Sequence, residues 1–296
     1  MKLSTDRILT THVGSLPRPE ALADALLARE HGEPYDAAGF GELVHESVCE
    51  AVRHQVEVGI DIVSDGEMSK ISYATYIKDR CSGFSGDSPR RVPADLERFP
   101  GFMATSAKQN QAPAIARPMC TGEVAVKTRV PLETDLRNFR DALTGSGAVE
   151  GFMNASSPGV INAFLPNEYY ASEEAYMDAL SKVLRDEYEA INEAGFVIQL
   201  DCPDLAMARH AQYKDLDDDA FVRLAGMHVE VLNEALKNVP ADMARLHLCW
   251  GNYEGPHDYD IPLAKIAGVL CRAKPQVLSF EAANPRHAHE WPVWGE

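Results

Sequence analysis

The sequence is poor in basic residues and has no long hydrophobic run. Its 296 residues include 28 Lys and Arg but 45 Asp and Glu, for a formal net charge of -17 at pH 7. Nucleic acids and anionic membranes are polyanions, so this charge argues against both as main partners. No run of about 18 apolar residues is present, and residues 1–7 contain no hydrophobic signal core. The sequence therefore predicts neither export nor membrane insertion, and a cytoplasmic location is expected.

The six cysteines are scattered along the chain, and no Cys-x-x-Cys pair is present. This spacing excludes a disulfide scaffold and argues against a redox motif or an all-thiolate zinc finger. A Gly-rich nucleotide-binding fingerprint is also missing. Reduced thiols are therefore expected.

The order of segments favours a single α/β barrel, because strand-like segments that end in polar residues alternate with helical ones. The predicted strands are residues 8–13, 61–64, 118–123, 152–155, 196–200, 245–250 and 277–280. The predicted helices are residues 20–30, 41–59, 135–148, 172–194 and 221–236. Polar candidates lie at five strand ends, which favours a ring over an open doubly wound sheet. We predict one domain over residues 1–296, a TIM-type (β/α)8 barrel.

The predicted strands number seven, whereas a closed barrel of this type has eight. The chain is therefore expected to be truncated before the last strand or strands, with an exposed edge beside residues 277–280. Between residues 72 and 118 the helical and strand periodicities fade, and we predict a long loop excursion over the barrel mouth. Arg90 and Arg91 in this excursion are candidates for neutralising an anionic substrate tail, although a solvated surface pair is the favoured interpretation.

A candidate metal site lies on the last two predicted strands. His247 and Cys249 stand two residues apart, so on a strand both side chains project from the same face. An imidazole and a thiolate suit zinc, and the carboxylate of Glu281 at the end of the next strand is a third ligand that zinc accepts. The alternative is that His247 is a hydrogen-bonded core histidine and Cys249 a small buried hydrophobic residue.

Two carboxylates also follow predicted strands, where barrel enzymes place binding and catalytic residues. Glu67 follows residues 61–64, and a solvated loop carboxylate is its alternative interpretation. Asp201 ends an apolar run, residues 196–200, and a carboxylate in that position needs a partner. Gly14 and Ser15 follow the first strand and fit a plain strand-to-helix turn.

Taken together, these segments resemble the cobalamin-independent methionine synthase family, in particular its short single-barrel members that correspond to the C-terminal catalytic barrel. The resemblance covers nearly the whole chain. It rests on Thr10-Thr-His-Val-Gly-Ser-Leu-Pro-Arg18, Ser64-Asp-Gly-Glu67, Asp201-Cys-Pro-Asp204, His247-x-Cys249 and Ser279-Phe-Glu281.

The resemblance implies zinc-dependent methyl or alkyl transfer to a small-molecule thiol. The zinc ligands would be His247, Cys249 and Glu281, and Glu67 and Asp201 would bind the amino group of the substrate. Gly14 and Ser15 would contact its amino-acid end. In the family's methionine-forming members, the thiol is homocysteine and the methyl donor is a methyltetrahydrofolate, so the implied activity is a 5-methyltetrahydropteroyltriglutamate–homocysteine methyltransferase.

The sequence departs from the family at two places. The family's fourth zinc ligand, a Cys in a later Asp-Cys-Gly segment, has no counterpart before Glu296. A water or a side chain such as His287 is expected to take its position. The family's Asp-Glu-Pro is Asp201-Cys202-Pro203 here, which puts homocysteine in doubt, and Asp204 is a candidate for the second carboxylate.

Three alternatives stay open. The chain could transfer an alkyl group from another donor to another thiol. Some relatives of the family join an epoxide to a sulfonate thiol in this way. It could be a metal-free porphyrin decarboxylase of the same barrel superfamily, although the acidic composition and the His-x-Cys and Glu residues argue against this. It could also be an inactive fragment or relic that lacks the fourth ligand.

Overall fold

The computed structural model of the chain describes residues 1–109, 115–251 and 255–295. Its centre is a sheet of five parallel strands in the order β1-β4-β5-β6-β7. Beyond β1, a parallel bridge joins Thr11 to Ile62 and continues the sheet towards the N-terminus. The strands are β1 Ile62–Ser64, β4 Glu150–Ser156, β5 Val197–Cys202, β6 Ala244–Leu248 and β7 Val277–Phe280.

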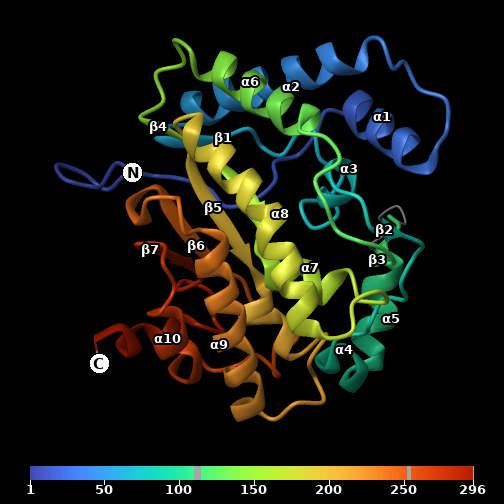
Figure 1. Ribbon diagram of the computed structural model, residues 1–296. Helices are drawn as coiled ribbons and strands as arrows, with labels where there is room; N and C mark the ends of the chain where they lie inside the picture. The colour runs from blue at the N-terminus through green and yellow to red at the C-terminus, as the bar shows by residue number, and fades with distance from the viewer. Residues whose placement is uncertain (110–114, 252–254, 296) are drawn as a thin grey trace.

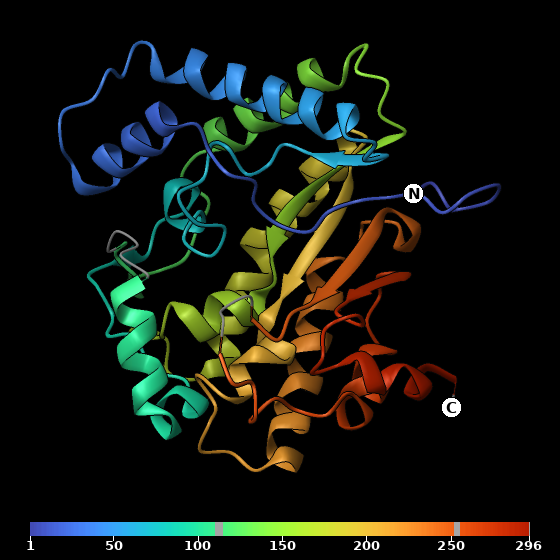
Figure 2. The same cartoon turned by 180° about the vertical axis from the view of Figure 1, so that it is seen from behind.

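Helices cover the outer face of this sheet (Figure 1). Helix α8 packs against β4 and β5, α9 packs against α8 and α10, and α2 packs against α6. The main helices are α1 Glu20–His31, α2 Phe40–Glu57, α6 Val130–Leu143, α7 Pro158–Phe164, α8 Glu173–Glu193, α9 Asp218–Ala235 and α10 Leu263–Leu270. Seen from behind, the N-terminal segment crosses the sheet on its other side (Figure 2). None of the described helices is long and apolar enough to cross a membrane.

Local chemistry explains where the long helices begin and end. Ser172 caps α8 by accepting a hydrogen bond from the Ala175 N–H at 3.2 Å, and Glu173 and Glu174 lie in the first turn, where the helix dipole favours negative charge. Gly59, with a φ of 88°, follows α2 and stops it because few other residues adopt that conformation. The five predicted helices are all present, with ends that differ by a few residues.

The sheet is curled into a half-barrel whose inner face carries layers of side chains. Asn154, Gln199 and Arg245 lie opposite one another on β4, β5 and β6, and Asp201 lies opposite His247 one layer further along. Residues in register on parallel strands share a face. Arg245 on β6 lies 3.4 Å from the Thr11 hydroxyl at the other end of the sheet, so the curl brings the two ends together.

The predicted α/β class with a curled parallel sheet is therefore confirmed, but two of the predicted strands are not as expected. Residues 118–123 do not form a barrel strand. Only Met119–Cys120, β3, is extended, and it pairs antiparallel with β2 Phe84–Ser85 in a separate small sheet. The reason is that β1 already bonds to the Thr11 segment on one side and to β4 on the other. Residues 8–13 contribute a single bridge instead of a full strand.

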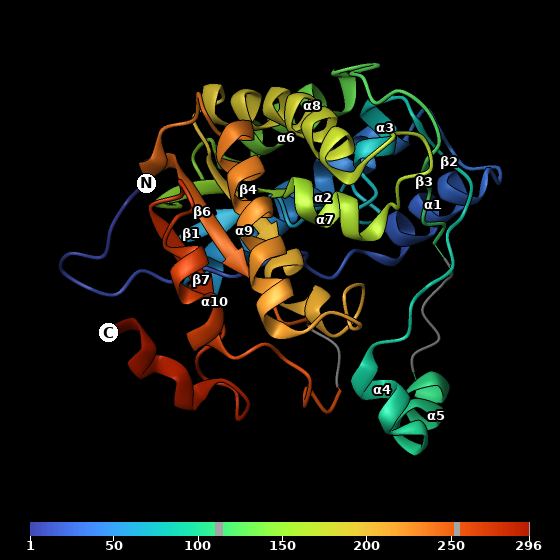
Figure 3. The same cartoon turned by 60° about the horizontal axis from the view of Figure 1, so that its bottom comes forward.

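The predicted excursion at residues 72–118 contains short regular elements. They are α3 Ile77–Arg80, β2, α4 Ala94–Arg98 and α5 Pro100–Gln109. Residues 110–114 of the excursion lie outside the described part. Figure 3 shows α4 and α5 standing away from the body of the half-barrel. The excursion thus brings residues of its own to one end of the sheet.

A buried ion pair joins the excursion to the helical layer. The guanidinium of Arg80 on α3 contacts the Glu187 carboxylate on α8, and both side chains are nearly inaccessible to solvent, at 4% and 3%. The Arg80 guanidinium also lies over the ring of Tyr76 at 4.7 Å. Because neither charge can reach water, each depends on the other.

Replacement of Glu187 by alanine should lower the free energy of unfolding by about 3–5 kcal/mol, since it leaves the Arg80 charge buried without its partner. Urea unfolding at neutral pH measures the loss. The control is Glu50→Ala, which removes the partner of Arg53 in an exposed ion pair on α2 and should cost less than about 1 kcal/mol. Equal losses in the two variants would contradict the assignment.

Candidate functional site

A chain of hydrogen bonds between polar side chains crosses the inner face of the half-barrel. Gln199 donates from Nε2 to the Asn154 Oδ1 at 2.9 Å, and its Oε1 accepts from the Arg245 Nε at 2.7 Å. All three side chains are buried. The Arg245 guanidinium also lies 3.8 Å from the centre of the Phe152 ring, and burial lowers the pKa of Arg245 to about 10. We call Asn154, Gln199 and Arg245 the polar ladder.

Glu67 lies at one side of this ladder. Asn154 donates from Nδ2 to the Glu67 Oε1 at 2.6 Å, and the Glu67 side chain is 3% exposed. Its backbone has a φ of 56°, a left-handed conformation that is strained for a residue with a Cβ. Burial raises the pKa of Glu67, the buried Lys70 opposes the rise, and the nearby Asp201 carboxylate adds to it. Glu67 is thus not the solvated loop carboxylate of the alternative interpretation.

Asp201 lies at the other side of the ladder and contacts a candidate metal ligand. Its Oδ1 accepts from the Gln199 Nε2 at 3.1 Å and lies 2.9 Å from the His247 Nδ1. Both residues lie at the carboxyl ends of their strands, β5 and β6. This contact orients the imidazole so that Nε2 is the nitrogen left to bind a ligand.

The loop with Gly14 and Ser15 packs beside the loop that holds Glu67. Leu16 donates from its backbone N–H to the Gly66 oxygen at 3.1 Å, and Arg18 donates to the Glu67 backbone oxygen at 3.0 Å. The structure therefore brings Gly14, Ser15 and Glu67 to one edge of the sheet. Asp201 is connected to Glu67 at this edge by hydrogen bonds through Gln199 and Asn154.

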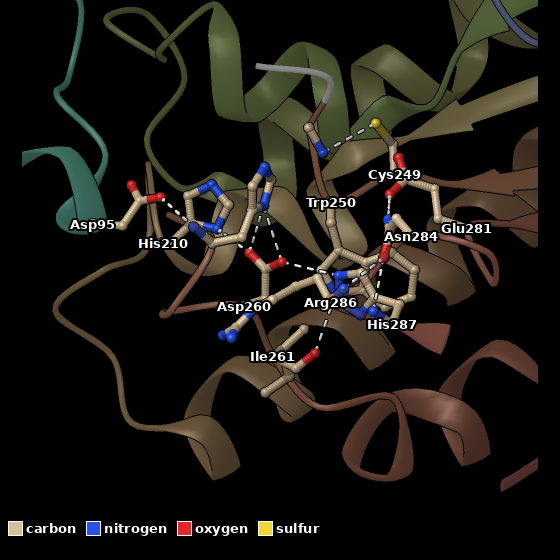
Figure 4. Close-up of polar contacts among 12 residues, drawn as sticks. Asp95, His210, Cys249, Trp250, Asp260, Ile261, Glu281, Asn284, Arg286 and His287 are labelled. Atoms are coloured by element: carbon tan, nitrogen blue, oxygen red, sulfur yellow. Dashed lines mark hydrogen bonds and ion pairs between the residues drawn. The ribbon is translucent and has the colours of Figure 1, made fainter. Parts of the chain in front are cut away.

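Cys249 and Glu281 follow neighbouring strands. Cys249 and Glu281 come directly after Leu248 and Phe280, the last paired residues of β6 and β7, and Figure 4 shows their side chains close together. The Cys249 Sγ accepts from the Gly251 N–H at 3.3 Å, and an oxygen of Glu281 accepts from Asn284. Burial raises the pKa of the Cys249 thiol to about 12.

The three predicted zinc ligands do not form a closed cluster in the structure. In the described part of the chain, no three His, Cys, Asp or Glu side chains are grouped so as to hold a metal ion. The donor types nevertheless fit zinc, with an imidazole held by a carboxylate, a thiol and a second carboxylate on adjacent strand ends.

A group of histidines surrounds one buried carboxylate near Trp250, the residue after Cys249 (Figure 4). Asp260 lies 3.0 Å from the ring nitrogens of His210, His257 and His287. Burial alone would raise the Asp260 pKa, but hydrogen bonds from the three imidazoles hold it well below its usual range. Trp250 stacks on His287 at 4.1 Å between ring centres. This group fixes the backbone next to Cys249.

The side chain of His287, which was expected as a candidate fourth ligand, is engaged with two carboxylates. Its Nε2 contacts Asp260 at 3.0 Å, and its Nδ1 contacts Glu290 at 2.8 Å. Both ring nitrogens are therefore engaged. The prediction that His287 fills the vacant ligand position is wrong for this arrangement.

Asp204 is likewise not the second substrate-binding carboxylate. Its Oδ1 accepts from the Ser157 hydroxyl at 2.6 Å, and its Oδ2 lies 2.9 Å from the His228 Nδ1. All three side chains are buried, and a Cβ at Gly159 would lie only 2.0 Å from the Asp204 Oδ2. Asp204 therefore serves the packing of α7 and α9 against the sheet.

Sequence analysis missed the polar ladder. The signal was a polar residue at every second position of otherwise apolar strands, as in Gln199-Leu-Asp201 and Arg245-Leu-His247-Leu-Cys249. Such a period of two marks one face of a strand. It does not show that the face points into the barrel or which residues meet there.

Comparison with known proteins identifies one family. Residues 8–256 match the family described as the cobalamin-independent synthase catalytic domain. The chain is similar to a methionine synthase of Sulfolobus acidocaldarius, with 26% identity over 245 residues, 82% of this chain and 62% of that protein. A methionine synthase of Thermococcus kodakarensis is 28% identical over 261 residues, 87% of this chain and 67% of that protein. The chain thus spans about three fifths to two thirds of the length of these relatives.

Among solved structures, the chain is similar to a B12-independent methionine synthase from Shewanella sp. W3-18-1 in complex with selenomethionine. The TM-score is 0.66 at 20% identity, and the match covers 94% of this chain and 74% of the other. At this identity the comparison establishes the α/β barrel fold only.

The raised pKa of Glu67 leads to a prediction about stability and pH. A buried carboxyl whose folded-state pKa is raised costs stability once the pH exceeds the ordinary value of 4.5. Glu67→Gln should therefore be more stable than the wild type at neutral pH, and the difference should vanish below pH 4.5. Denaturant unfolding across this pH range measures the effect, with the exposed Glu46→Gln as control. A wild type that gains stability relative to Glu67→Gln as the pH rises would reverse the sign and refute the prediction.

Proposed function

The chain belongs to the catalytic-domain family of the cobalamin-independent synthases, and from this premise we propose that it transfers a methyl or alkyl group to the sulfur of a small thiol. The proposal includes a zinc ion held by His247, Cys249 and Glu281, with the substrate sulfur in the remaining position. The observation that carries it is that Cys249 and Glu281 directly follow the paired ends of β6 and β7, beside a histidine oriented by Asp201.

Zinc bound there supplies a Lewis acid that lowers the pKa of a coordinated substrate thiol, so that a thiolate forms near neutral pH. The surrounding residues prepare this position. Asp201 holds the His247 Nδ1, which leaves Nε2 for a metal. The buried Cys249, with a pKa of about 12, is protonated at neutral pH and would release its proton when a metal binds.

The carboxylates of Glu67 and Asp201 suit the ammonium group of an amino-acid thiol. The Asp201 carboxylate lies close enough to contribute to the raised pKa of Glu67, and Glu67 is buried. A bound ammonium would relieve this repulsion. Homocysteine is the acceptor we propose, with a methyltetrahydrofolate as the methyl donor. Gly14 and Ser15 would contact the amino-acid end from the adjacent loop.

A second candidate is alkyl transfer to a different thiol or from a different donor. The observation in its favour is the Asp201-Cys202-Pro203 segment. Cys202 is fully buried, and Asp204 is engaged with Ser157 and His228. No further carboxylate in this segment is thus free for an ammonium group, which weakens the selection for an amino-acid thiol.

Metal analysis tests the zinc site. The purified chain, incubated with zinc at neutral pH and desalted, should retain about one zinc ion per chain. Cys249→Ser and His247→Ala should lose most of it, because each removes a ligand. Cys271→Ser, which changes an exposed thiol, should retain zinc as the wild type does. Absence of zinc from the wild type would overturn the assignment.

Steady-state kinetics tests the ammonium site. Glu67→Gln should raise the KM for homocysteine about tenfold to hundredfold, since a hydrogen bond to a charged group contributes about 1.5–3 kcal/mol. Zinc content should not change. The comparison substrate is butane-1-thiol, which lacks the amino and carboxyl groups. If both thiols lose affinity equally, Glu67 has a structural role only.

A further inference from the structure

We infer that Arg90, Arg91 and Arg117 form a subsite for an oxyanion, carried by a substrate whose reacting end lies beside Cys249. The three arginines line a cavity of about 420 Å³. The same cavity is lined at another part of its wall by Tyr73, Met207, Cys249 and Gly251. The inference deepens the proposed function and rests on it only for the position of the reacting end.

Two stretches of the excursion are joined so that the arginines meet. Ser88 donates from its backbone N–H to the Arg117 oxygen at 2.7 Å, and Arg117 donates from its own N–H to the Asp87 Oδ1 at 2.8 Å. The stretch before α4 therefore runs beside the stretch before β3, which places Arg90 near Arg117. Arg91 is held by a hydrogen bond from its Nη1 to the Gln212 backbone oxygen at 2.8 Å.

Positive charge predominates among these side chains, and the Asp87 carboxylate offsets part of it at Arg117. Burial lowers the pKa of Arg117, and the guanidinium of Arg90 lowers it further. Within residues 1–109, 115–251 and 255–295, none of the three arginines has an ion pair with a carboxylate side chain. The Arg117 guanidinium instead lies over the Phe164 ring at 5.2 Å. A group of like charges beside a cavity, in a chain with a net charge of -17, suits a bound anion.

The position of the cavity separates this group from ordinary surface arginines. Arg98 on α4 illustrates the ordinary case, because it pairs with Asp258. A second cavity of about 570 Å³ shares the three arginines but also has Glu168 and Glu173 in its wall. The anion is therefore expected in the first cavity, on the side of Cys249.

Sulfonates, carboxylates and phosphates share the oxyanion chemistry that a guanidinium fork recognises. The test titrates the full chain with propane-1-sulfonate, butyrate and propyl phosphate, and with propan-1-ol as the uncharged reference, by isothermal calorimetry at low ionic strength. The wild type should bind at least one anion about tenfold or more tightly than the alcohol. The preferred anion indicates which kind of substrate the site takes.

Arg117→Gln and Arg90→Gln should each abolish most of this preference, and Arg117→Lys should retain part of it because the charge remains. Arg137→Gln, an equal charge change on the exposed face of α6, should leave it intact. Arg90 is exposed, so its variant provides folded protein even if Arg117→Gln does not fold. No preference for any anion in the wild type, or an equal loss in Arg137→Gln, would overturn the inference.

The titration requires neither zinc nor turnover. A failure of the proposed anion subsite can therefore be distinguished from a failure of the proposed zinc site. Arginine-dependent anion binding in a protein that retains no zinc would support the subsite and reject the zinc site. Zinc retention without an arginine-dependent anion preference would support the zinc site and reject the anion subsite.

Discussion

The arrangement of the half-barrel depends on the polar ladder of Asn154, Gln199 and Arg245. Each of these buried side chains is a hydrogen-bond partner of the next, across β4, β5 and β6. A buried polar group that loses its partner costs about 1–3 kcal/mol, so a shift in the register of any one strand would leave several groups unpaired. Arg245 also reaches Thr11, which ties the N-terminal segment to the far end of the sheet. The same contacts therefore maintain both register and curl.

The ladder also sets the electrostatics of the candidate site. It holds Glu67 through Asn154 and Asp201 through Gln199, so two carboxylates are kept near each other inside the sheet. Their repulsion and burial raise the Glu67 pKa, and the backbone of Glu67 is strained as well. The buried Lys70 opposes this rise, so one positive charge of the protein itself already lies near the Glu67 carboxylate.

Much of the framework was predictable from the sequence, because it depends on local patterns. The helices have caps and periodic apolar faces, and the strands after residue 150 are short apolar runs between them. Residues 118–123 have the same composition as a barrel strand. Whether they join the sheet depends on whether one side of β1 still has backbone groups free to pair with them. The polar ladder depends on hydrogen bonds between residues far apart in the chain. The same holds for the hydrogen bonds of Asp204 and His287. A single sequence contains no direct signal for such partners.

Tyr73 lies in the wall of the cavity that Cys249 and the three arginines also line. Burial raises the pKa of Tyr73 well above its usual value, with further contributions from Asp201 and Cys249, so the phenol stays neutral at physiological pH. Tyr73 is also near enough to Arg117 to affect its pKa. Tyr73 is thus subject to the charges of both groups while it carries none itself. In the described part of the chain the Glu67 and Asp201 carboxylates do not line the cavity, so the arginines and a neutral phenol are what it presents to a ligand.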